Sequence, residues 1–591
     1  MARRAATTGP GPASARRSRR RVSTGALVVI TVAVAAVVMA GLSAQAIAAH
    51  SSCTSRPVLL NVAVNLDLAP AVERVAQDFN RQEHRADGRC TQVQVTEATS
   101  ATVAGRIDGQ DSRNGMPSVD AWIPDSSLWV DVARSFPLGA RDVQPTSISV
   151  ARSPLVIAMP KTVADATHAF DSPTGWSLLL PHADGGPPRS LGLKVDLPDP
   201  ADSAAGLATL VELSRMLGHG EAARTSFTKF VLSSEATSQF DSPAALGSFV
   251  STAAPPFSAR PVTVTSEQAV IAYDRANPAR PLAAQYPADF SSALASPVLN
   301  YPYVLTSSDP AEREAAREFG QELQQPYAAS VVRYSGFRSA DGSIDATPAS
   351  FGLRSQVLTE AAAAAPSEAQ TTLEVWSKLG LGSRDLVLID TSAAMAHPVA
   401  PGLPATLEQE LTQTAVLGLA LFPDSTQMGE WQIGGTQNGK PYQQLVPVGP
   451  LPADLGLITR RQQLQQIDET LHPGTGALAL NNTILAAYKQ MTASYQPDYA
   501  NAVIVLTAGV DTAGDMPTSA LLAQLRKLFN PSRKVEVVVL QLGTAGNFPA
   551  MQQIAAATGG AAFEITKPAQ VAKAFIKGFS RRLCDPHCAA P

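Results

Sequence analysis

The sequence VLLNVAVNLD at residues 58–67 begins a β–α–β unit, the repeating element of parallel α/β folds. Its first part is an apolar run typical of a buried strand. A helical pattern follows at about residues 69–83, and a second strand pattern, TQVQVTEATS, follows Cys90. Parallel sheets place their ligand sites at the C-terminal ends of the strands. We therefore expect such a sheet here, with Asn65 at its C-terminal edge.

Further segments repeat the order of strand, polar loop and helix as far as residue 306. VDAWIPDSSLWVDVA (119–133) and SPLVIAMP (153–160) each contain a short buried strand. DPADSAAGLATLVEL (199–213) and TVTSEQAVIAY (263–273) place a serine where a helix would begin, and PVLNYPYVLT (297–306) adds another strand. Serine is a preferred residue at a helix N-cap, so these motifs predict strand-to-helix turns.

Taken in order, these motifs make residues 55–360 resemble the extracellular solute-binding domains of transport systems for small solutes and oxyanions. More narrowly, they resemble the domains that high-GC Gram-positive bacteria fuse to a von Willebrand factor type A domain. The resemblance implies a periplasmic-binding-protein-like fold of two α/β lobes with the ligand between them. The ligand-site residues that it implies are Asn65, Ser100, Asp125, Ser126, Ser203 and Ser266. Helix starts favour an anion or a polar group, and helix capping is the alternative interpretation of these side chains.

A second α/β pattern occupies residues 376–583, after an alanine-rich linker at residues 361–375. RDLVLIDTSAAM (384–395) is a buried strand that ends in polar residues. Strands recur at NAVIVLTAG (501–509) and KVEVVVLQLG (534–543), with helices between them. This alternation predicts a doubly wound, Rossmann-like parallel sheet. The segment resembles von Willebrand factor type A domains over nearly its whole length.

The resemblance to type A domains implies a divalent cation held by hydroxyl and carboxylate oxygens at the end of the sheet. Asp390 and Ser392 match the first loop of that site. Three of the five ligand positions carry no oxygen in this sequence: Ala394, Leu478 and Ala508. We therefore expect a degenerate site with no cofactor, in which Asp390 caps a helix or binds the region of Thr507. A weakly bound cation such as Mg²⁺ is the alternative.

The N-terminal segment predicts a membrane anchor. Residues 1–21 form a basic tail without acidic residues, and an uncharged apolar run follows at residues 25–42. The run is close to the ~20 residues that cross a bilayer, and the arginines favour a cytoplasmic tail. We expect a transmembrane signal anchor at residues 22–49 in a single-pass cell-membrane protein whose bulk is extracytoplasmic. A cleaved signal peptide that ends near Ala48 is the alternative.

The cysteines are Cys53, Cys90, Cys584 and Cys588, and all follow the predicted anchor. An oxidising compartment favours disulfides, although four cysteines allow three pairings. Cys53 and Cys90 precede neighbouring parallel strands, which start at the same edge of a sheet, so we expect them to pair. Cys584 and Cys588 would then pair in the C-terminal tail, residues 584–591.

Enzyme and nucleic-acid functions have little support in the sequence. Gly434–Lys440 has the spacing of a phosphate loop, but Pro441 replaces the required Ser or Thr. Asn438–Gly439 is better interpreted as a β-hairpin turn. The chain has no HExxH or GxSxG motif, its eight histidines are scattered, and its net charge is −4. We therefore expect neither catalysis nor a nucleic-acid partner.

The function that these patterns favour is capture of a small solute or oxyanion between two lobes at the cell surface. The type A domain would serve for interaction, with a protein as its partner. The alternative function is an interaction or adhesion scaffold without a small-molecule ligand. A polar pocket around Ser126, Ser203 and Ser266 would favour capture, and a collapsed or apolar one would favour the scaffold.

Overall fold

The structure is a computed structural model, and its described residues are 56–109, 117–171, 175–180, 193–237, 246–247, 250, 260–287, 295–345, 352–353, 359–360, 364–437, 440–510 and 515–584. The predicted anchor at residues 22–49, Cys53 and Cys588 lie outside these residues. Within the described ranges, no helix has the length and apolar character needed to span a bilayer.

The first lobe surrounds a six-stranded sheet with the order β2-β3-β1-β4-β13-β5. β1 (Val58–Val64) and β3 (Arg89–Glu97) are parallel, and α2 (Ala69–Arg81) joins them, which confirms the predicted β–α–β unit. α2 buries a stripe of apolar residues that recur every three or four positions. The other elements of this lobe are β2 (Arg85–Ala86), α3 (Ser100–Ile107), β4 (Ala121–Ile123), α4 (Ser127–Arg134), α5 (Pro137–Asp142), β5 (Gln144–Ser149), β13 (Pro302–Leu305), α11 (Pro310–Glu322) and α12 (Pro326–Tyr334).

The second lobe surrounds a sheet with the order β10-β6-β9-β7-β8. β7 (Leu193–Pro198) and β9 (Arg260–Ser266) are parallel, and each is followed by a helix, α7 (Ala204–Leu217) and α10 (Glu267–Ala276). The other elements are β6 (Ser153–Pro160), α6 (Lys161–Thr167), α8 (Glu221–Ser233), β8 (Glu235–Thr237), β10 (Leu282–Gln285) and β12 (Val298–Leu299). The predicted arrangement of two α/β lobes is therefore confirmed.

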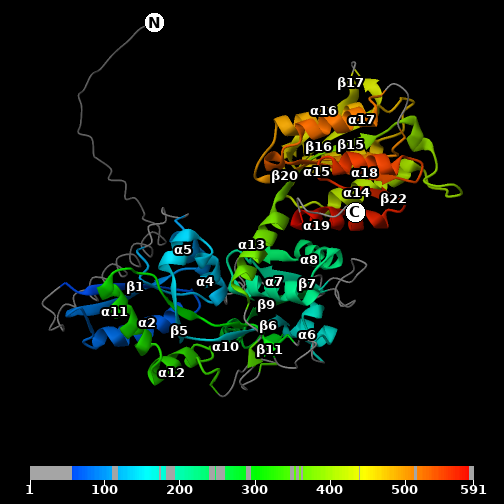
Figure 1. Cartoon of the computed structure of the whole chain (residues 1–591). Helices are drawn as coiled ribbons and strands as arrows, with labels where there is room; N and C mark the ends of the chain where they lie inside the picture. Colours follow the sequence, from blue (N-terminus) through cyan, green and yellow to red (C-terminus); the bar gives the residue numbers. More distant parts are fainter. Residues whose placement is uncertain are drawn as a thin grey trace, which may run out of the picture.

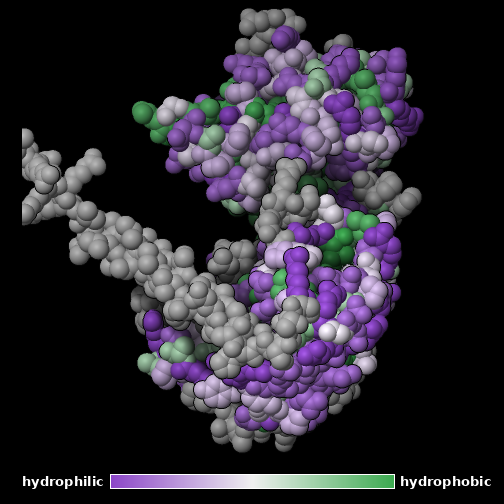
Figure 2. All heavy atoms as spheres, turned by 90° about the vertical axis from the view of Figure 1, so that its left-hand side faces the viewer, coloured by the Kyte–Doolittle hydropathy of each residue, from purple (hydrophilic) through white to green (hydrophobic). Residues whose placement is uncertain are grey.

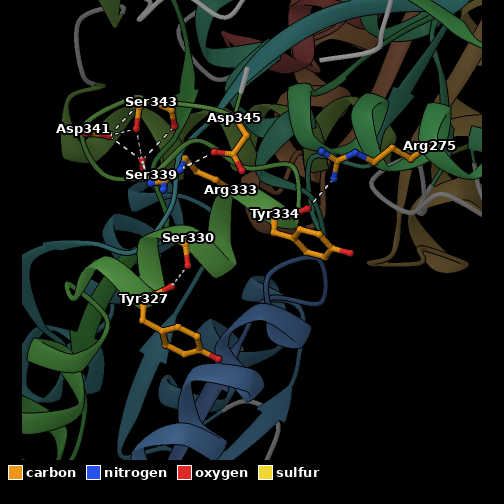
Figure 3. A network of polar contacts seen from close by, with 9 residues as sticks. All are labelled: Arg275, Tyr327, Ser330, Arg333, Tyr334, Ser339, Asp341, Ser343 and Asp345. Atoms are coloured by element: carbon orange, nitrogen blue, oxygen red, sulfur yellow. Dashed lines mark hydrogen bonds and ion pairs between the residues drawn. The ribbon is translucent and has the colours of Figure 1, made fainter. Parts of the chain in front are cut away.

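The lobes are joined where β5 leads into β6 and β12 leads into β13. The Val150 N–H donates to the Tyr301 carbonyl there at 3.0 Å. On the same side, Figure 3 shows Arg275 of α10 donating to the carbonyl of Tyr334, at 2.8 Å, at the end of α12. These bonds tie elements of one lobe to elements of the other around the crossing strands.

A buried ion pair reinforces this hinge region. Arg338, which follows α12, donates from Nε and Nη2 to the two carboxylate oxygens of Glu267 at 2.7 and 2.8 Å. Arg338 is 2% exposed and Glu267 is fully buried. The Tyr286 hydroxyl also donates to Glu267, so the carboxylate is held from two sides.

The second domain is a six-stranded sheet with the order β17-β16-β15-β20-β21-β22, as expected for a doubly wound fold. Five strands are parallel, and β17 pairs antiparallel with β16. Gln437 pairs with Lys440, which confirms the predicted hairpin. The strands are β15 (Gly382–Asp390), β16 (Gln427–Gln437), β17 (Lys440–Pro450), β20 (Tyr499–Thr507), β21 (Val535–Leu542) and β22 (Ala562–Ile565).

Helices cover both faces of this sheet (Figure 1). α16 (Leu480–Ala493), α17 (Thr518–Leu528) and α18 (Phe548–Ala556) pack over one face. α14 (Leu407–Leu421), α15 (Arg460–Thr470) and α19 (Ala569–Ser580) pack over the other. The side chains of β15 alternate between the two cores, as the two-residue period of a strand requires.

A helix connects the two domains. α13 (Pro366–Gly380) covers most of the predicted linker, residues 361–375. It packs against α4 of the first lobe and α7 of the second lobe. Arg215 of α7 pairs with Glu368 at 2.6 Å. On the face that Figure 2 shows, hydrophilic side chains dominate, and hydrophobic side chains gather near the junction of the two domains and at places on the second domain.

Candidate functional site

Three of the predicted site residues cap helices in the first domain. All three are buried. Each hydroxyl accepts a hydrogen bond from a backbone N–H two or three residues later: Ser126 from Leu128 at 3.2 Å, Ser203 from Ala205 at 3.2 Å, and Ser266 from Ala269 at 3.1 Å. The capping interpretation is confirmed for these hydroxyls, and contact with a solute stays a prediction.

The other three predicted residues form a polar cluster at the C-terminal edge of the first lobe's sheet. The Ser100 hydroxyl donates to Asp125 Oδ1 at 2.6 Å, and Ser100 Oγ lies 3.3 Å from Asn65 Oδ1. The Asp125 backbone N–H donates to Ser100 Oγ at 3.1 Å. Ser100 and Asp125 are buried, while Asn65 is partly exposed. The sequence predicted all three as ligand-site residues; the fold brings them together, and their contact with a solute stays a prediction.

Asp125 also reaches the second lobe. Its Oδ2 accepts a hydrogen bond from the backbone N–H of Ala204 at 3.1 Å. Ala204 is the first residue of α7, directly after the cap Ser203. A carboxylate at a helix N-terminus is stabilised by the free N–H groups and the helix dipole. The first lobe thus supplies an anion to the helix start where the resemblance places a ligand, and the lobes are closed at this point.

Sequence reasoning missed two members of the site, Asp67 and Tyr301. The Tyr301 hydroxyl donates to Asp67 Oδ2, and Asn65 Nδ2 donates to Asp67 Oδ1 at 2.8 Å. Burial raises the pKa of Asp67, while these two hydrogen bonds oppose that rise. Tyr301 has φ of 37°, which is rare for a residue with a Cβ and is typical of functional sites and tight hinges. Both residues lie in motifs that the sequence analysis identified, but no sequence signal indicates that Tyr301 contacts Asp67.

The third cap, Ser266, belongs to a different part of the lobe interface. It starts α10, whose first residue is Glu267 of the buried ion pair. The site therefore consists of Asn65, Asp67, Ser100, Asp125 and Tyr301, with the α7 start after Ser203. Ser126 and Ser266 serve the starts of their own helices.

The carboxylate at the predicted cation site of the second domain is engaged by the protein itself. Asp390 is fully buried, and its carboxylate accepts hydrogen bonds from the Ser392 N–H at 2.8 Å and the Thr507 hydroxyl at 2.7 Å. The Ala508 N–H also donates to it, at 3.2 Å. Burial raises the pKa of Asp390 despite these bonds. Across the described part of the chain, no cluster of three or more acidic, histidine or cysteine side chains has a metal-binding arrangement.

Asp515, which precedes α17, also has its carboxylate engaged. Its carboxylate accepts hydrogen bonds from the backbone N–H groups of Asn481 and Asn482 at 2.6 and 3.1 Å. It therefore supports the first turn of α16. The predicted role of Asp390 in binding the Thr507 region is confirmed by its hydrogen bond.

Cys90 and Cys584 are disulfide-bonded. Cys53 and Cys588 lie outside the described residues, so the pairing of Cys53 with Cys90 and of Cys584 with Cys588 stays a prediction.

Two domain families match the chain. Bacterial extracellular solute-binding proteins match residues 60–338, and von Willebrand factor type A domains match residues 386–577. Two uncharacterized proteins of Mycobacterium tuberculosis, one from each of two strains, are 25% identical to it over 582 residues. That similarity covers 92% of this chain and 80% of each relative. The chain therefore carries a solute-binding-protein domain followed by a type A domain.

Solved structures resemble the parts of the chain more distantly. Iron-bound HitA of Pseudomonas aeruginosa has a TM-score of 0.40 and 15% identity, covering 55% of this chain and all of its own. The sulfate-binding protein SubI of M. tuberculosis has a TM-score of 0.33 and 18% identity, over 48% of this chain and 88% of its own. A type A protein of Catenulispora acidiphila has a TM-score of 0.26 and 18% identity, over 34% of this chain and 43% of its own. These scores carry no argument about a ligand.

Proposed function

We propose that this chain is a membrane-anchored, extracytoplasmic binding protein whose first domain captures a small polar solute between its two lobes. The observation that carries this proposal is the hydrogen bond between Asp125 and Ala204. This bond joins the polar cluster of the first lobe to the start of α7 in the second lobe. The carboxylate and the backbone N–H that could each bind a solute are therefore bonded to each other in this closed arrangement.

The chemistry of the cluster favours a solute that donates hydrogen bonds. Asp67 and Asp125 contribute carboxylates, and Asn65 contributes an amide. A polyol or an amine would satisfy these acceptors directly. An oxyanion, the other class that the sequence suggested, would have to replace Asp125 at the start of α7, because both are anions that need the same N–H groups. We therefore place donor-rich solutes first and oxyanions second.

The second domain would act in protein interaction without a metal. The carboxylate of Asp390 is engaged by Thr507 and Ala508, which supports a structural role for it. Solute-binding and type A domains typically lack enzyme activity, and we propose no catalysis. The N-terminal segment would hold both domains at the outer face of the cell membrane, where disulfides are stable.

Isothermal titration calorimetry with polyols, amines, sulfate and phosphate tests the proposal. A donor-rich solute should bind the wild-type protein and bind Asp125→Asn at least about tenfold more weakly, since a charged acceptor is lost. Sulfate or phosphate should bind Asp125→Asn better than the wild type if the α7 start accepts oxyanions.

Asp131→Asn provides the matched control. Asp131 lies on α4, close to Asp125 in the chain, and removal of its charge leaves the polar cluster intact. Its binding should equal that of the wild type. Absence of binding by every solute class, in all three proteins, would contradict solute capture.

A further inference from the structure

A cavity of about 360 Å³ lies inside the type A domain, between the sheet and the helices α14, α15 and α19. Protein interiors are close-packed and contain few voids larger than a water molecule. This volume falls in the range of small-molecule sites, about 300–1,000 Å³. It is distinct from the metal position at Asp390 and from the polar cluster between the lobes of the first domain.

The walls of the cavity are mainly apolar. Alternate side chains of β15, β20 and β21 form its floor, and apolar residues of the three helices form its roof. Representative wall residues are Val387, Leu419, Ile504, Ala574 and Phe575. A molecule with an apolar body would bury that body here and gain the free energy of apolar transfer.

The mouth of the cavity lies at the N-terminal edge of the sheet, next to the domain junction. Lys378, Leu381 and Pro497 line this end and are exposed. Arg582 connects the residues at this end, because it donates hydrogen bonds to the Leu381 carbonyl at 2.9 Å and to Ser383 Oγ at 2.8 Å. The strand β15 starts at this edge, so a ligand can enter without unfolding the sheet.

A pair of acids lies deeper in the cavity. Glu430 pairs with Val387 of β15, five residues beyond the start of that strand, or about 16 Å at the usual rise of a strand. Glu430 is 2% exposed, and Asp468 of α15 is 5% exposed. Burial and the neighbouring Asp468 carboxylate raise the pKa of Glu430 well above its ordinary value. Burial likewise raises the pKa of Asp468 to about 7.

These acids have unused hydrogen-bonding capacity. Four buried wall residues have a side-chain oxygen with no hydrogen-bond partner among the described residues: Asp385, Thr414, Glu430 and Asp468. Buried polar atoms without a partner are costly and rare in native proteins. Two neighbouring buried acids either stay protonated or need a partner that donates hydrogen bonds or carries a positive charge.

We propose that this cavity binds an amphiphilic amine, with its apolar body along the sheet and its ammonium group between Glu430 and Asp468. The apolar walls match the body, and the pair of acids matches the head group, because a bound ammonium donates hydrogen bonds to them and stabilises their ionised form. A divalent cation does not fit as well, because within the described residues no set of three or more candidate ligands gathers at the pair. The inference is independent of solute capture, since it concerns the other domain.

Calorimetric titration of the full protein with decylamine, decanol and decanoate tests the proposal. These probes share an apolar body and differ in the charge of the head group. Decylamine should bind saturably and at least about tenfold more tightly than decanol, because only it pairs with the acids. Equal affinity for the three probes, or no saturable binding of decylamine, would overturn the proposal.

Three variants locate the binding. Glu430→Gln/Asp468→Asn should lose the preference for decylamine, while Glu469→Gln should keep it. Glu469 is an exposed acid beside Asp468 on α15, so this control makes a similar change of charge outside the cavity. Ala574→Phe should abolish binding of every probe by filling the apolar part. Decylamine binding that survives in the double variant would place the site elsewhere.

Vesicles that contain phosphatidylethanolamine identify the source of the amine. If the ligand is a free amine, the protein should bind decylamine and should not associate with these vesicles. If the ligand is a lipid headgroup, the wild-type protein should associate with the vesicles, and Glu430→Gln/Asp468→Asn should not. Association that is equal in the two proteins, together with equal decylamine binding, would contradict the site.

Discussion

Asp125 of the first lobe accepts a hydrogen bond from the backbone N–H of Ala204, the first residue of α7 in the second lobe, at 3.1 Å. Its other carboxylate oxygen is held by Ser100 at 2.6 Å. One side chain therefore links the sheet edge of one lobe to a helix start of the other. Asp125 therefore stabilises the closed arrangement of the lobes. It also competes with any anion for the N–H groups at the start of α7.

Ala204→Pro should remove the hydrogen bond between Asp125 and the Ala204 N–H and leave α7 intact. Proline is well tolerated at the first position of a helix but has no N–H to donate. We expect a loss of about 1.5–3 kcal/mol in the free energy of unfolding, as for a hydrogen bond to a charged group. Urea unfolding measures it. A double-mutant cycle with Asp125→Asn controls for a clash of the proline ring, because additive losses would mean that the two residues are not coupled.

Glu267→Gln should strongly destabilise the first domain. The change leaves the guanidinium of Arg338 buried without its anion, and removal of one partner from such a pair costs about 3–5 kcal/mol. Asp345→Asn is the matched control. Its ion pair with Arg333 is largely exposed on the aspartate side (Figure 3), so we expect a loss of no more than about 1 kcal/mol. Equal losses in urea unfolding would contradict the structural role of the buried pair.

The type A domain should lose stability as the pH rises from acid to neutral. The pKa of Asp468 rises from its ordinary 3.8 to about 7 in the fold, and that of Glu430 moves in the same direction. Between those values the folded state binds more protons than the unfolded chain, so the free energy of unfolding falls with pH. Below the ordinary pKa and above the raised pKa, these groups add no slope.

Hydrogen exchange of the amides in β15 and β20 measures the stability of the type A domain separately from that of the first domain, and so reports how it falls with pH. Glu430→Gln/Asp468→Asn should flatten the pH dependence and make the domain more stable above neutral pH, because no buried charge then forms. Asp385, whose pKa burial also raises to about 7, should retain part of the slope. Glu469→Gln should change the profile only slightly, because burial is the larger cause of the raised Asp468 pKa and the nearby Glu469 carboxylate the smaller one; a profile as flat as that of the double variant would refute this assignment.

The type A domain should be indifferent to Mg²⁺ and to EDTA. Asp390→Asn should cost about 1–3 kcal/mol, since its amide group cannot accept all the hydrogen bonds that the carboxylate accepts. The loss should be the same with and without Mg²⁺, as measured by thermal unfolding. A midpoint that Mg²⁺ raises in the wild type but not in Asp390→Asn would show a working metal site.

The sequence predicted most strands and the helix caps, because strand ends and N-caps depend on local patterns. Ser203 and Asp125 are examples of positions that their neighbours in the chain define. It did not predict that Asp125 would bond across the lobes, because that contact depends on how two distant segments meet. The tyrosine at 301 was missed for the same reason.

The acids of the cavity show a different limit. Glu430 lies on a strand and Asp468 on a helix, and each has the polarity expected of a surface residue. Their burial results from the way α15 packs against α14 and β17 and leaves a cavity over this face of the sheet. Periodicity identifies which face of an element is apolar, but it does not reveal a polar residue that a cavity keeps inside.

Thermal unfolding of the protein with a panel of polyols, amines and oxyanions is the most direct test of solute capture. A solute at about 100 times its dissociation constant should stabilise the first domain by about 2.7 kcal/mol and raise its midpoint. The account predicts such a shift for at least one donor-rich solute, and a smaller shift in Asp125→Asn. No shift with any solute class would contradict capture and favour a scaffold that works through its protein partners.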